Sequence, residues 1–401
     1  MRALSRPSIP CCLAFAMIAG ACSSSANNSW APKTGASTTT IASAEAAKAY
    51  TAPGPYPVGI TTLELAGGAK VEVWYPAAPG TTGKDSYDVR KLVPPTVTKL
   101  LTASIPAIYT IDAGRDAPVA DGTFPLVLFS HGFSGIRQQS SFLTSHIASW
   151  GFIVAAPDHW SRDLYHVLDG VLGGKPAKAA DSVDDLRHTR TLLTDDNTRP
   201  GSRFAGHVDT TRIAAIGHSA GGASALGLAS DDGIAGYASL ASGALLGGGP
   251  NTTTSTAPPP PLPSKPSLFV AGKDDHVASV DKVTLPAFAA APAPSRLWVL
   301  DRVGHNGFDD FCTFGNGKGI IGVAEASGLS GFLDAQPQFR TLGEDGCLKP
   351  NAPVAETFPV IDHVVVAWLR ELFSVDASPV GLGPEVANAY PVNVEVREKL
   401  S

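Results

Sequence analysis

The stretch that most constrains this chain is an apolar run that stops abruptly at a glycine. Residues 213–216 are all apolar, which is typical of a central parallel strand buried on both faces. The run ends in Gly-His-Ser-Ala-Gly at residues 217–221, and the small residues 222–228 predict a helix. Gly-x-Ser-x-Gly between strand and helix is typical of a sharp turn that holds its serine, here Ser219, in a strained conformation with the hydroxyl exposed. Glycines flank the serine because a side chain there would collide where strand and helix cross.

Strands and helices alternate along most of the chain. We predict an antiparallel hairpin over residues 58–65 and 70–75. Further buried strands are expected at residues 124–130, 152–156, 236–241, 267–271 and 296–300, and helices at 97–101, 138–150, from 182 onward and at 360–373. The alternation predicts one α/β domain over residues 51–401, a doubly wound, mostly parallel sheet flanked by helices. Residues 161–180 are expected to lie above the sheet and 249–266 to form a proline-rich loop.

Composition excludes one large class of partner. The chain has 401 residues, of which 44% are hydrophobic, so it can bury a substantial core. Its formal net charge is −6 and it contains no basic run, which argues against nucleic-acid binding. We expect a monomer.

Chemistry-bearing side chains follow the last two predicted parallel strands. In a doubly wound sheet, such groups lie just past the carboxyl ends of the strands. Asp275 comes after the strand at 267–271, and His305 after the strand at 296–300. A serine hydroxyl needs a base within hydrogen-bond reach, itself oriented by a carboxylate. We therefore expect Ser219 to be a nucleophile, His305 to take its proton, and Asp275 to orient the imidazole.

Other residues compete for these roles. Asp274 is the alternative acid, and three further carboxylates are placed less well: Asp231, Asp232 and Asp301. His159 and His276 lie near the same edge of the sheet and compete with His305 as the base. His131 and His218 sit inside tight turns, where we expect them to be structural.

Two backbone N–H groups are expected to stabilise the negative oxygen that forms when the serine attacks. One belongs to Ala220, directly after the nucleophile, and the other to Phe133, in the turn after the strand at 124–130. Phe133 and Trp160 are expected to contact substrate, beside the small residues Gly243 and Ala244. Such small walls predict a preference for acetyl to butyryl groups. No metal or cofactor is implied, because no His/Cys/Asp cluster has ligand spacing.

The N-terminus reads as an export signal. Arg2 and Arg6 precede an apolar segment at residues 11–20 that is too short to span a bilayer. Small residues then lead to Cys22, as in bacterial lipoprotein signals, where the cysteine is lipidated. We expect a signal peptide over residues 1–21 and a flexible tether over 22–50, with simple secretion as the alternative. The membrane would then be reached only through the lipid.

Cysteine usage agrees with export. Cys11 and Cys12 belong to the signal and Cys22 to the anchor, which leaves Cys312 and Cys347. In an oxidising compartment these two most simply form one disulfide, and two free buried thiols are the alternative.

Four blocks of this sequence resemble the platelet-activating factor acetylhydrolase family. They are residues 125–135, 151–158, 208–222 and 305–314. The resemblance implies an α/β-hydrolase fold, whose chain order of nucleophile, acid and base matches Ser219, Asp275 and His305, and hydrolysis of short acyl esters of a phospholipid-like or other lipophilic alcohol. Mammalian members carry the acid after the strand that follows the elbow. Residues 238–242 hold no carboxylate here, which favours Asp275.

Two other groups share part of this pattern. Bacterial cutinase-like polyester hydrolases are similar at residues 208–212 and 275–280, but usually place a tryptophan where this chain has Gly243 and Ala244. Dienelactone hydrolases share the sheet but use a cysteine nucleophile, where Ser219 stands here. The leading hypothesis is therefore an exported serine esterase acting on small-molecule or lipid esters. The second is a non-catalytic surface lipoprotein that keeps the fold as a binding module.

Overall fold

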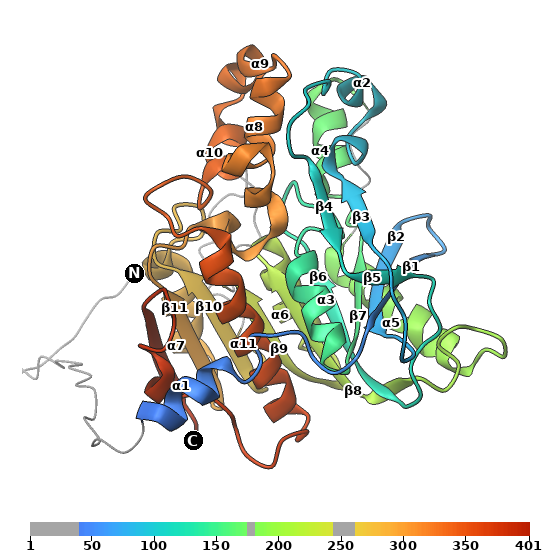
Figure 1. Cartoon of the computed structure of the whole chain (residues 1–401), viewed down its shortest axis with the longest axis vertical. Helices are drawn as coiled ribbons and strands as arrows, with labels where there is room; N and C mark the ends of the chain where they lie inside the picture. The colour runs from blue at the N-terminus through green and yellow to red at the C-terminus, as the bar shows by residue number, and fades with distance from the viewer. Residues whose placement is uncertain (1–39, 175–180, 244–260) are drawn as a thin grey trace, which may run out of the picture. The chain divides into compact units, whose positions relative to one another are not determined.

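Ten strands form one sheet in the computed structural model, which describes residues 40–174, 181–243 and 261–401 (Figure 1). The strand order is β12-β11-β10-β9-β8-β6-β7-β2-β1-β5. From β11 to β7 every neighbouring pair is parallel. Antiparallel partners are added at the edges, where β12 pairs with β11 and the β1–β2 hairpin pairs with β7. The predicted doubly wound, mostly parallel sheet is therefore confirmed, and so is the hairpin.

The strands of this sheet, in chain order, are β1 (Val58–Glu64), β2 (Lys70–Pro76), β5 (Ala113–Arg115), β6 (Phe124–Ser130), β7 (Ile153–Pro157), β8 (Val208–His218), β9 (Ile234–Leu240), β10 (Ser267–Gly272), β11 (Ser295–Leu300) and β12 (Val394–Lys399). A separate two-stranded sheet pairs β3 (Asp85–Asp88) with β4 (Ile108–Ile111).

Helices cover both faces of the large sheet. On one face lie α1 (Thr40–Lys48), α3 (Ser141–Ser149) and α11 (Val354–Leu372), and on the other α5 (Ser182–Thr198), α6 (Ala220–Leu228) and α7 (Leu285–Ala290). Strand β6 shows why its sequence is apolar throughout. Val127 and Phe129 pack in the core under α3 and α11, whereas Leu126 and Leu128 pack in the core under α5 and α6. A strand buried on both faces needs apolar side chains at every position.

Short elements form a cap beyond the carboxyl ends of the parallel strands (Figure 1). One side of the cap contains the β3–β4 hairpin, α2 (Pro95–Thr98) and α4 (Leu164–Val171). The other side contains α8 (Gly319–Ala326), α9 (Ser330–Ala335) and α10 (Pro337–Glu344). A third apolar core joins the two sides through Val89, Leu164, Phe311 and Val323, among other residues. Chain residues far apart in sequence therefore cover the same edge of the sheet.

The predicted tether ends earlier than expected. Residues 40–48 form helix α1 rather than flexible chain. Tyr50 is buried, its ring stacks on His363 of helix α11, and its hydroxyl donates to Asp376 at 2.5 Å. Residues 40–50 therefore differ from the tether predicted over residues 22–50, because the chain is helical at 40–48 and the side chains of Ala47 and Tyr50 are buried. The compact domain therefore includes the residues from 40 onward, rather than from 51.

Several expectations fall on residues outside the described ranges. The predicted signal peptide, Cys22 and the tether up to residue 39 lie there, as do residues 175–180 and most of the proline-rich loop. Where residues 161–180 are described, they include helix α4. In the described part of the chain, no helix combines the length and apolar character needed to cross a bilayer.

A disulfide closes the base of the α8–α10 helices. Cys312 and Cys347 are bonded, with their Cα atoms 4.8 Å apart and a sequence separation of 35. Helices α8, α9 and α10 all lie inside this loop and contact one another. The predicted pairing of the two cysteines is therefore present in the structure. We call the segment between the two cysteines, residues 313–346, the disulfide arm.

Replacing both cysteines with serine should destabilise the protein. A cross-link over 35 residues removes chain entropy from the unfolded state, which corresponds to about 3–4 kcal/mol. Denaturant unfolding of the double variant and of wild type measures the difference, and wild type unfolded under reducing conditions should match the variant. Equal stability of the variant and oxidised wild type would contradict the expectation, as would two free thiols in the intact mass of protein purified without reductant.

Candidate active site

Ser219 occupies the turn between strand β8 and helix α6. Its backbone has φ 56° and ψ −126°, a conformation that non-glycine residues rarely adopt. A Cβ atom on Gly217 would lie 2.0 Å from the carbonyl oxygen of Gly221, and one on Gly221 would lie 1.9 Å from the carbonyl oxygen of Ser130. Only glycine fits at either position, which is why strand and helix can cross so closely beside the serine.

Ser219, His305 and Asp275 form a continuous hydrogen-bonded line. His305 Nε2 lies 2.9 Å from Ser219 Oγ, and His305 Nδ1 lies 2.9 Å from Asp275 Oδ2. His305 begins a short 3-10 turn after β11, and Asp275 lies in the loop after β10. All three side chains are buried. The structure thus brings together the three residues selected from strand ends, and within the described residues Asp274 makes no hydrogen bond to His305.

The Asp275 carboxylate is also held by backbone. The N–H groups of Val277 and Ala278 donate to its Oδ1 at 2.8 and 2.6 Å. Burial alone raises the pKa of this carboxyl, but the charge and hydrogen bond of His305 and the two backbone donors outweigh burial, so the pKa of Asp275 lies below its usual value. Asp275 is therefore ionised at neutral pH. It faces Nδ1–H of His305, where its negative charge stabilises a positively charged imidazolium ring.

The two expected N–H donors lie in backbone next to the serine. Ala220 is the first residue of helix α6, directly after Ser219. A Cβ atom on Gly132, which precedes Phe133, would lie 3.2 Å from Cβ of Ser219. Among the residues described, no protein group accepts a hydrogen bond from the N–H of Phe133 or of Ala220. Both donors are free for an oxygen atom bound beside the serine hydroxyl.

A half-buried arginine, Arg162, holds the loop that carries Phe133. Arg162 Nη2 donates to the carbonyl oxygen of His131 at 2.8 Å and to Ser130 Oγ at 2.7 Å. Its Nη1 donates to Ser224 Oγ, on helix α6, at 2.9 Å. Burial lowers the pKa of Arg162 to about 10, which still leaves the guanidinium charged at neutral pH. One side chain therefore joins the loop of one N–H donor to the helix that begins with the other.

Gln139 makes a second connection between the same loop and the elbow. Its Oε1 accepts from the N–H of Gly132 at 3.2 Å, and its Nε2 donates to His218 Nδ1 at 2.5 Å. His218 Nε2 must then carry the proton, since it lies 3.0 Å from the carbonyl oxygen of His305, which can only accept. Burial and the nearby His305 charge lower the pKa of His218 to about 3, so the ring is neutral. His218 is structural, as expected for a histidine inside the elbow.

The remaining histidines near this edge do not contact Ser219. His159 is buried between Ser130 Oγ and Asp185 Oδ2, each 2.8 Å from one ring nitrogen. His131 Nε2 accepts from the backbone N–H of His159 at 3.1 Å. The side chain of His276 is 78% exposed. None of them replaces His305 beside the serine.

Asp345 is a part of the site that sequence reasoning missed. Its Oδ1 accepts from the backbone N–H of His305 at 2.7 Å, and its Oδ2 accepts from the N–H of His276 at 3.0 Å. Its carbonyl oxygen accepts from the N–H of Asn306 at 2.9 Å. One buried carboxylate therefore joins the loop of the base to the loop of the acid. Its place two residues before Cys347 is the only sequence signal that pointed to this region.

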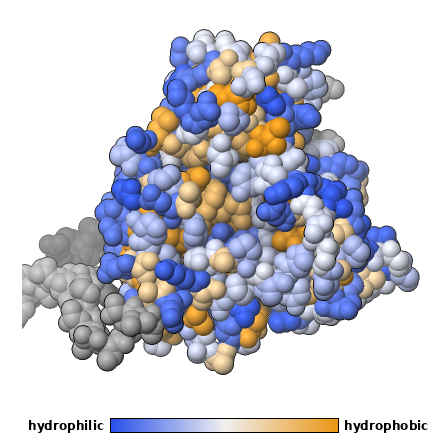
Figure 2. All heavy atoms as spheres, in the orientation of Figure 1, coloured by the Kyte–Doolittle hydropathy of each residue, from blue (hydrophilic) through white to orange (hydrophobic). Residues whose placement is uncertain are grey.

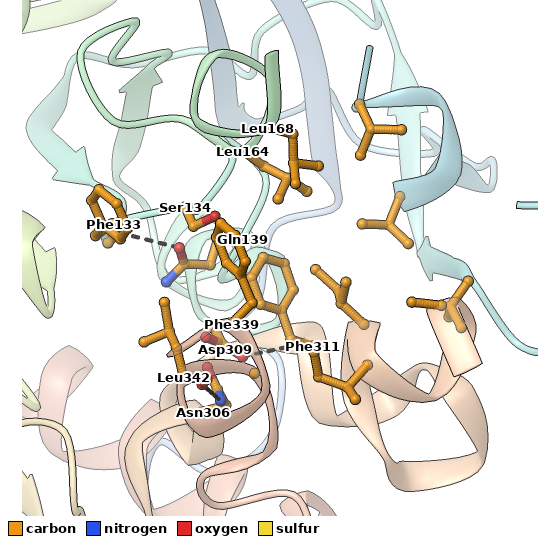
Figure 3. A pocket seen from close by; sticks show the side chains of 18 of the residues that line it. Phe133, Ser134, Gln139, Leu164, Leu168, Asn306, Asp309, Phe311, Phe339 and Leu342 are labelled. Carbon is orange, nitrogen blue, oxygen red and sulfur yellow. Dashed lines mark hydrogen bonds between the residues drawn. The ribbon is translucent and has the colours of Figure 1, made fainter. Parts of the chain in front are cut away.

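An apolar pocket opens beside Ser219 (Figure 3). Gly132, Phe133, Ser219 and His305 line it on the side of the sheet, together with the polar residues Ser134, Gln139, His218, Asn306 and Asp309, and the cap supplies most of the apolar wall. The apolar side chains that the cap contributes are Val89, Val93, Val97, Leu101, Leu164, Leu168, Phe311, Ile320, Ile321, Val323, Ala324, Leu329, Phe332, Leu333, Phe339 and Leu342. Apolar residues also gather between the two sides of the cap in the space-filling view (Figure 2). The site therefore suits a lipophilic ligand.

The predicted substrate wall needs correction. Phe133 lines the pocket as expected, and its side chain is partly exposed. Trp160 does not, because it packs near His166 in a separate hollow with Asp158. Gly243 is not among the lining residues, and Ala244 lies outside the described residues. The pocket beside Ser219 is lined by larger apolar side chains of the cap, rather than by the small residues that the sequence predicted.

The described residues hold no cluster of three or more His, Cys, Asp or Glu side chains positioned to bind a metal ion.

Removing the Asp345 carboxylate should misplace the base. We expect Asp345→Ala to lower kcat roughly ten- to a hundredfold, because the backbone of His305 loses its acceptor and small shifts of a reacting group are costly. Steady-state kinetics measures the loss. The matched control is His276→Ala, which removes an exposed ring 3.2 Å from Asp345 Oδ2 but keeps both backbone N–H groups, of His276 and His305, that donate to this carboxylate. Full turnover in Asp345→Ala would contradict a positioning role.

Two family models and one solved structure are similar to this chain. The family model described as platelet-activating factor acetylhydrolase, isoform II, matches residues 42–168, and the model described as chlorophyllase matches residues 115–270. A ferulic acid esterase from Streptomyces cinnamoneus has a similar fold, with a TM-score of 0.57, 22% identity, and coverage of 87% of this chain and 99% of that one. Neither family match extends to Asp275 or His305. The chain has the α/β-hydrolase fold, and it is a carboxylic ester hydrolase.

Proposed function

We propose that this chain is an exported serine esterase that cleaves lipophilic esters with a small acyl group through an acyl-enzyme. The observation that carries the proposal is the line of hydrogen bonds from Ser219 through His305 to Asp275, beside two N–H groups that have no acceptor among the described residues. A binding protein has no need for the strained backbone at Ser219, whereas a nucleophile does.

The reaction follows from the positions of these groups. His305 Nε2 accepts the proton of Ser219 as Oγ attacks the ester carbonyl, and Asp275 stabilises the imidazolium that results. The N–H groups of Phe133 and Ala220 donate to the oxyanion, and loss of one such donor typically costs about a hundred- to a thousandfold in rate. His305 then protonates the leaving alkoxide. A water molecule, activated by the same imidazole, hydrolyses the acyl-enzyme.

The pocket supports a lipophilic substrate. Its apolar walls can take up a hydrocarbon chain, and each buried methylene favours binding by about 0.8 kcal/mol. The match to an acetylhydrolase family supports a small acyl group. We therefore place the lipophilic alcohol, rather than a long acyl chain, in the pocket between the two sides of the cap.

Export is supported by the disulfide, which persists in oxidising compartments. Lipidation at Cys22 would anchor the domain to a membrane surface. Cell fractionation tests this part: wild type should be found with membranes, and Cys22→Ala should be released. If wild type is already free of membranes, simple secretion replaces the lipid anchor.

The three residues should act as one unit. Ser219→Ala is expected to lower kcat roughly a million-fold, as in comparable triads, and to abolish labelling by an organophosphonate. Asp275→Asn should cost roughly ten-thousandfold, because it favours the wrong tautomer of His305. Asp274→Asn is the matched control and should retain most activity. A larger loss in Asp274→Asn than in Asp275→Asn would overturn the assignment of the acid.

Two ester series separate the acyl group from the alcohol. In p-nitrophenyl esters of increasing acyl length, kcat/KM should peak between acetyl and butyryl. In acetate esters of increasing alcohol length, kcat/KM should rise as the chain fills the apolar pocket. A maximum at an eight-carbon acyl group or beyond would show that the pocket holds the acyl chain, and would leave the nucleophile and base unchanged.

A further inference from the structure

One carboxyl group lines the apolar pocket without a full set of partners. Asp309 is 1% exposed and belongs to the pocket wall (Figure 3). Its Oδ1 accepts from the N–H of Phe311 at 3.0 Å. Its Oδ2 makes no hydrogen bond to any described residue, and the nearest ring nitrogen, His218 Nδ1, is 4.0 Å away and already bonded to Gln139. A buried polar atom with a free valence facing a pocket is suited to a ligand.

The neighbouring carboxyl shows what a purely structural aspartate looks like here. Asp310 accepts from the N–H groups of Ser141 and Phe142 at 2.8 and 3.1 Å, and from the hydroxyl of Tyr87 at 2.9 Å. It thereby ties the segment after His305 to the first turn of helix α3, and it does not line the pocket. The Asp-Asp pair therefore divides into one residue with a full set of partners and one with a free oxygen.

The free oxygen of Asp309 is a donor. Burial and the neighbouring Asp310 raise the pKa of Asp309 well above its usual range, against the opposing effect of the Phe311 N–H. A carboxyl that is buried in an apolar wall, with one N–H donor and no cation among its described neighbours, favours its neutral, protonated form. Because Oδ1 already accepts from Phe311, the proton belongs on Oδ2, the atom on the pocket side. A neutral O–H in apolar surroundings binds an acceptor oxygen well, since little water competes there.

We propose that Asp309 is a substrate-binding residue that donates a hydrogen bond to a carbonyl or ether oxygen in the lipophilic part of the ester. The inference rests on the proposed function. His218 lies between Asp309 and the base: its ring is centred 4.8 Å from that of His305, which is bonded to Ser219. The acceptor oxygen is therefore several bonds away from the scissile carbonyl. The substrate class is a lipophilic ester with a second oxygen function in the chain that enters the pocket.

The test compares acetates of equal length that differ only in one chain atom. The probes are heptyl acetate and its ether analogues 2-butoxyethyl, 3-propoxypropyl and 4-ethoxybutyl acetate. In wild type, at least one ether ester should exceed heptyl acetate in kcat/KM by roughly three- to tenfold, the effect of one added hydrogen bond. In Asp309→Ser, which can still cap the Phe311 N–H but is too short to reach the ligand, this ratio should fall to about one or below.

Two further variants separate recognition from structure. Asp309→Asn keeps an acceptor for Phe311 and supplies an N–H donor, so the ether preference should return. Asp310→Asn, which alters the structural neighbour, should keep the preference even if the protein is less stable. No ether preference in wild type, or a preference that survives in Asp309→Ser, would overturn the proposal. Failure of wild type to hydrolyse any of the four esters would instead overturn the proposed function.

Discussion

The backbone of Ser219 is the constraint on which the rest of the site depends. Its conformation costs of order 1–3 kcal/mol, so the surrounding structure must hold it in place. The N–H of Ser219 donates to the carbonyl oxygen of Leu240 on strand β9 at 2.9 Å, and its own carbonyl accepts from Ser242 Oγ at 2.6 Å. Both partners are buried and come from the strand next to β8 or its end. Hydrogen bonds to the neighbouring strand therefore hold Ser219 in its strained conformation. They fix the position of Ser219 Oγ, and with it the position that the His305 ring must occupy to accept the proton.

Sequence alone predicted the sheet and the three residues at its edge for one physical reason. Strands β6 and β10 and the second half of β8, from Ile213, are buried on both faces, so they appear in the sequence as continuous, mostly apolar runs that can be recognised without knowing the rest of the fold. Parallel strands end at the same edge, so polar residues just after such runs meet there. Gly217 and Gly221 predicted the sharp turn between strand β8 and helix α6 that holds Ser219. Asp275 and His305 therefore followed from local pattern and chain order.

The cap could not be predicted in the same way. Helices α8, α9 and α10 have six to eight residues each, too few for a helical period to stand out. Their partners in the pocket wall, such as Val89 and Leu164, lie far away in the sequence. Asp345 accepts hydrogen bonds from backbone N–H groups, and Asp309 lines the pocket. Neither arrangement leaves a recognisable pattern in the sequence. The error at Trp160 has the same origin, because proximity to a strand end does not tell which hollow a ring enters.

The two ends of the disulfide arm lie so close together that the arm can be regarded as an insertion into the domain. The Cα atoms of Cys312 and Cys347 are 4.8 Å apart, only slightly more than the 3.8 Å between consecutive residues. A short turn can therefore bridge the two ends without moving the strands that carry the serine, the acid and the base. Asp345, inside the arm, is the exception that such an exchange must preserve. A lineage of such chains can thus diversify its substrates by exchanging one segment while its reaction chemistry stays constant.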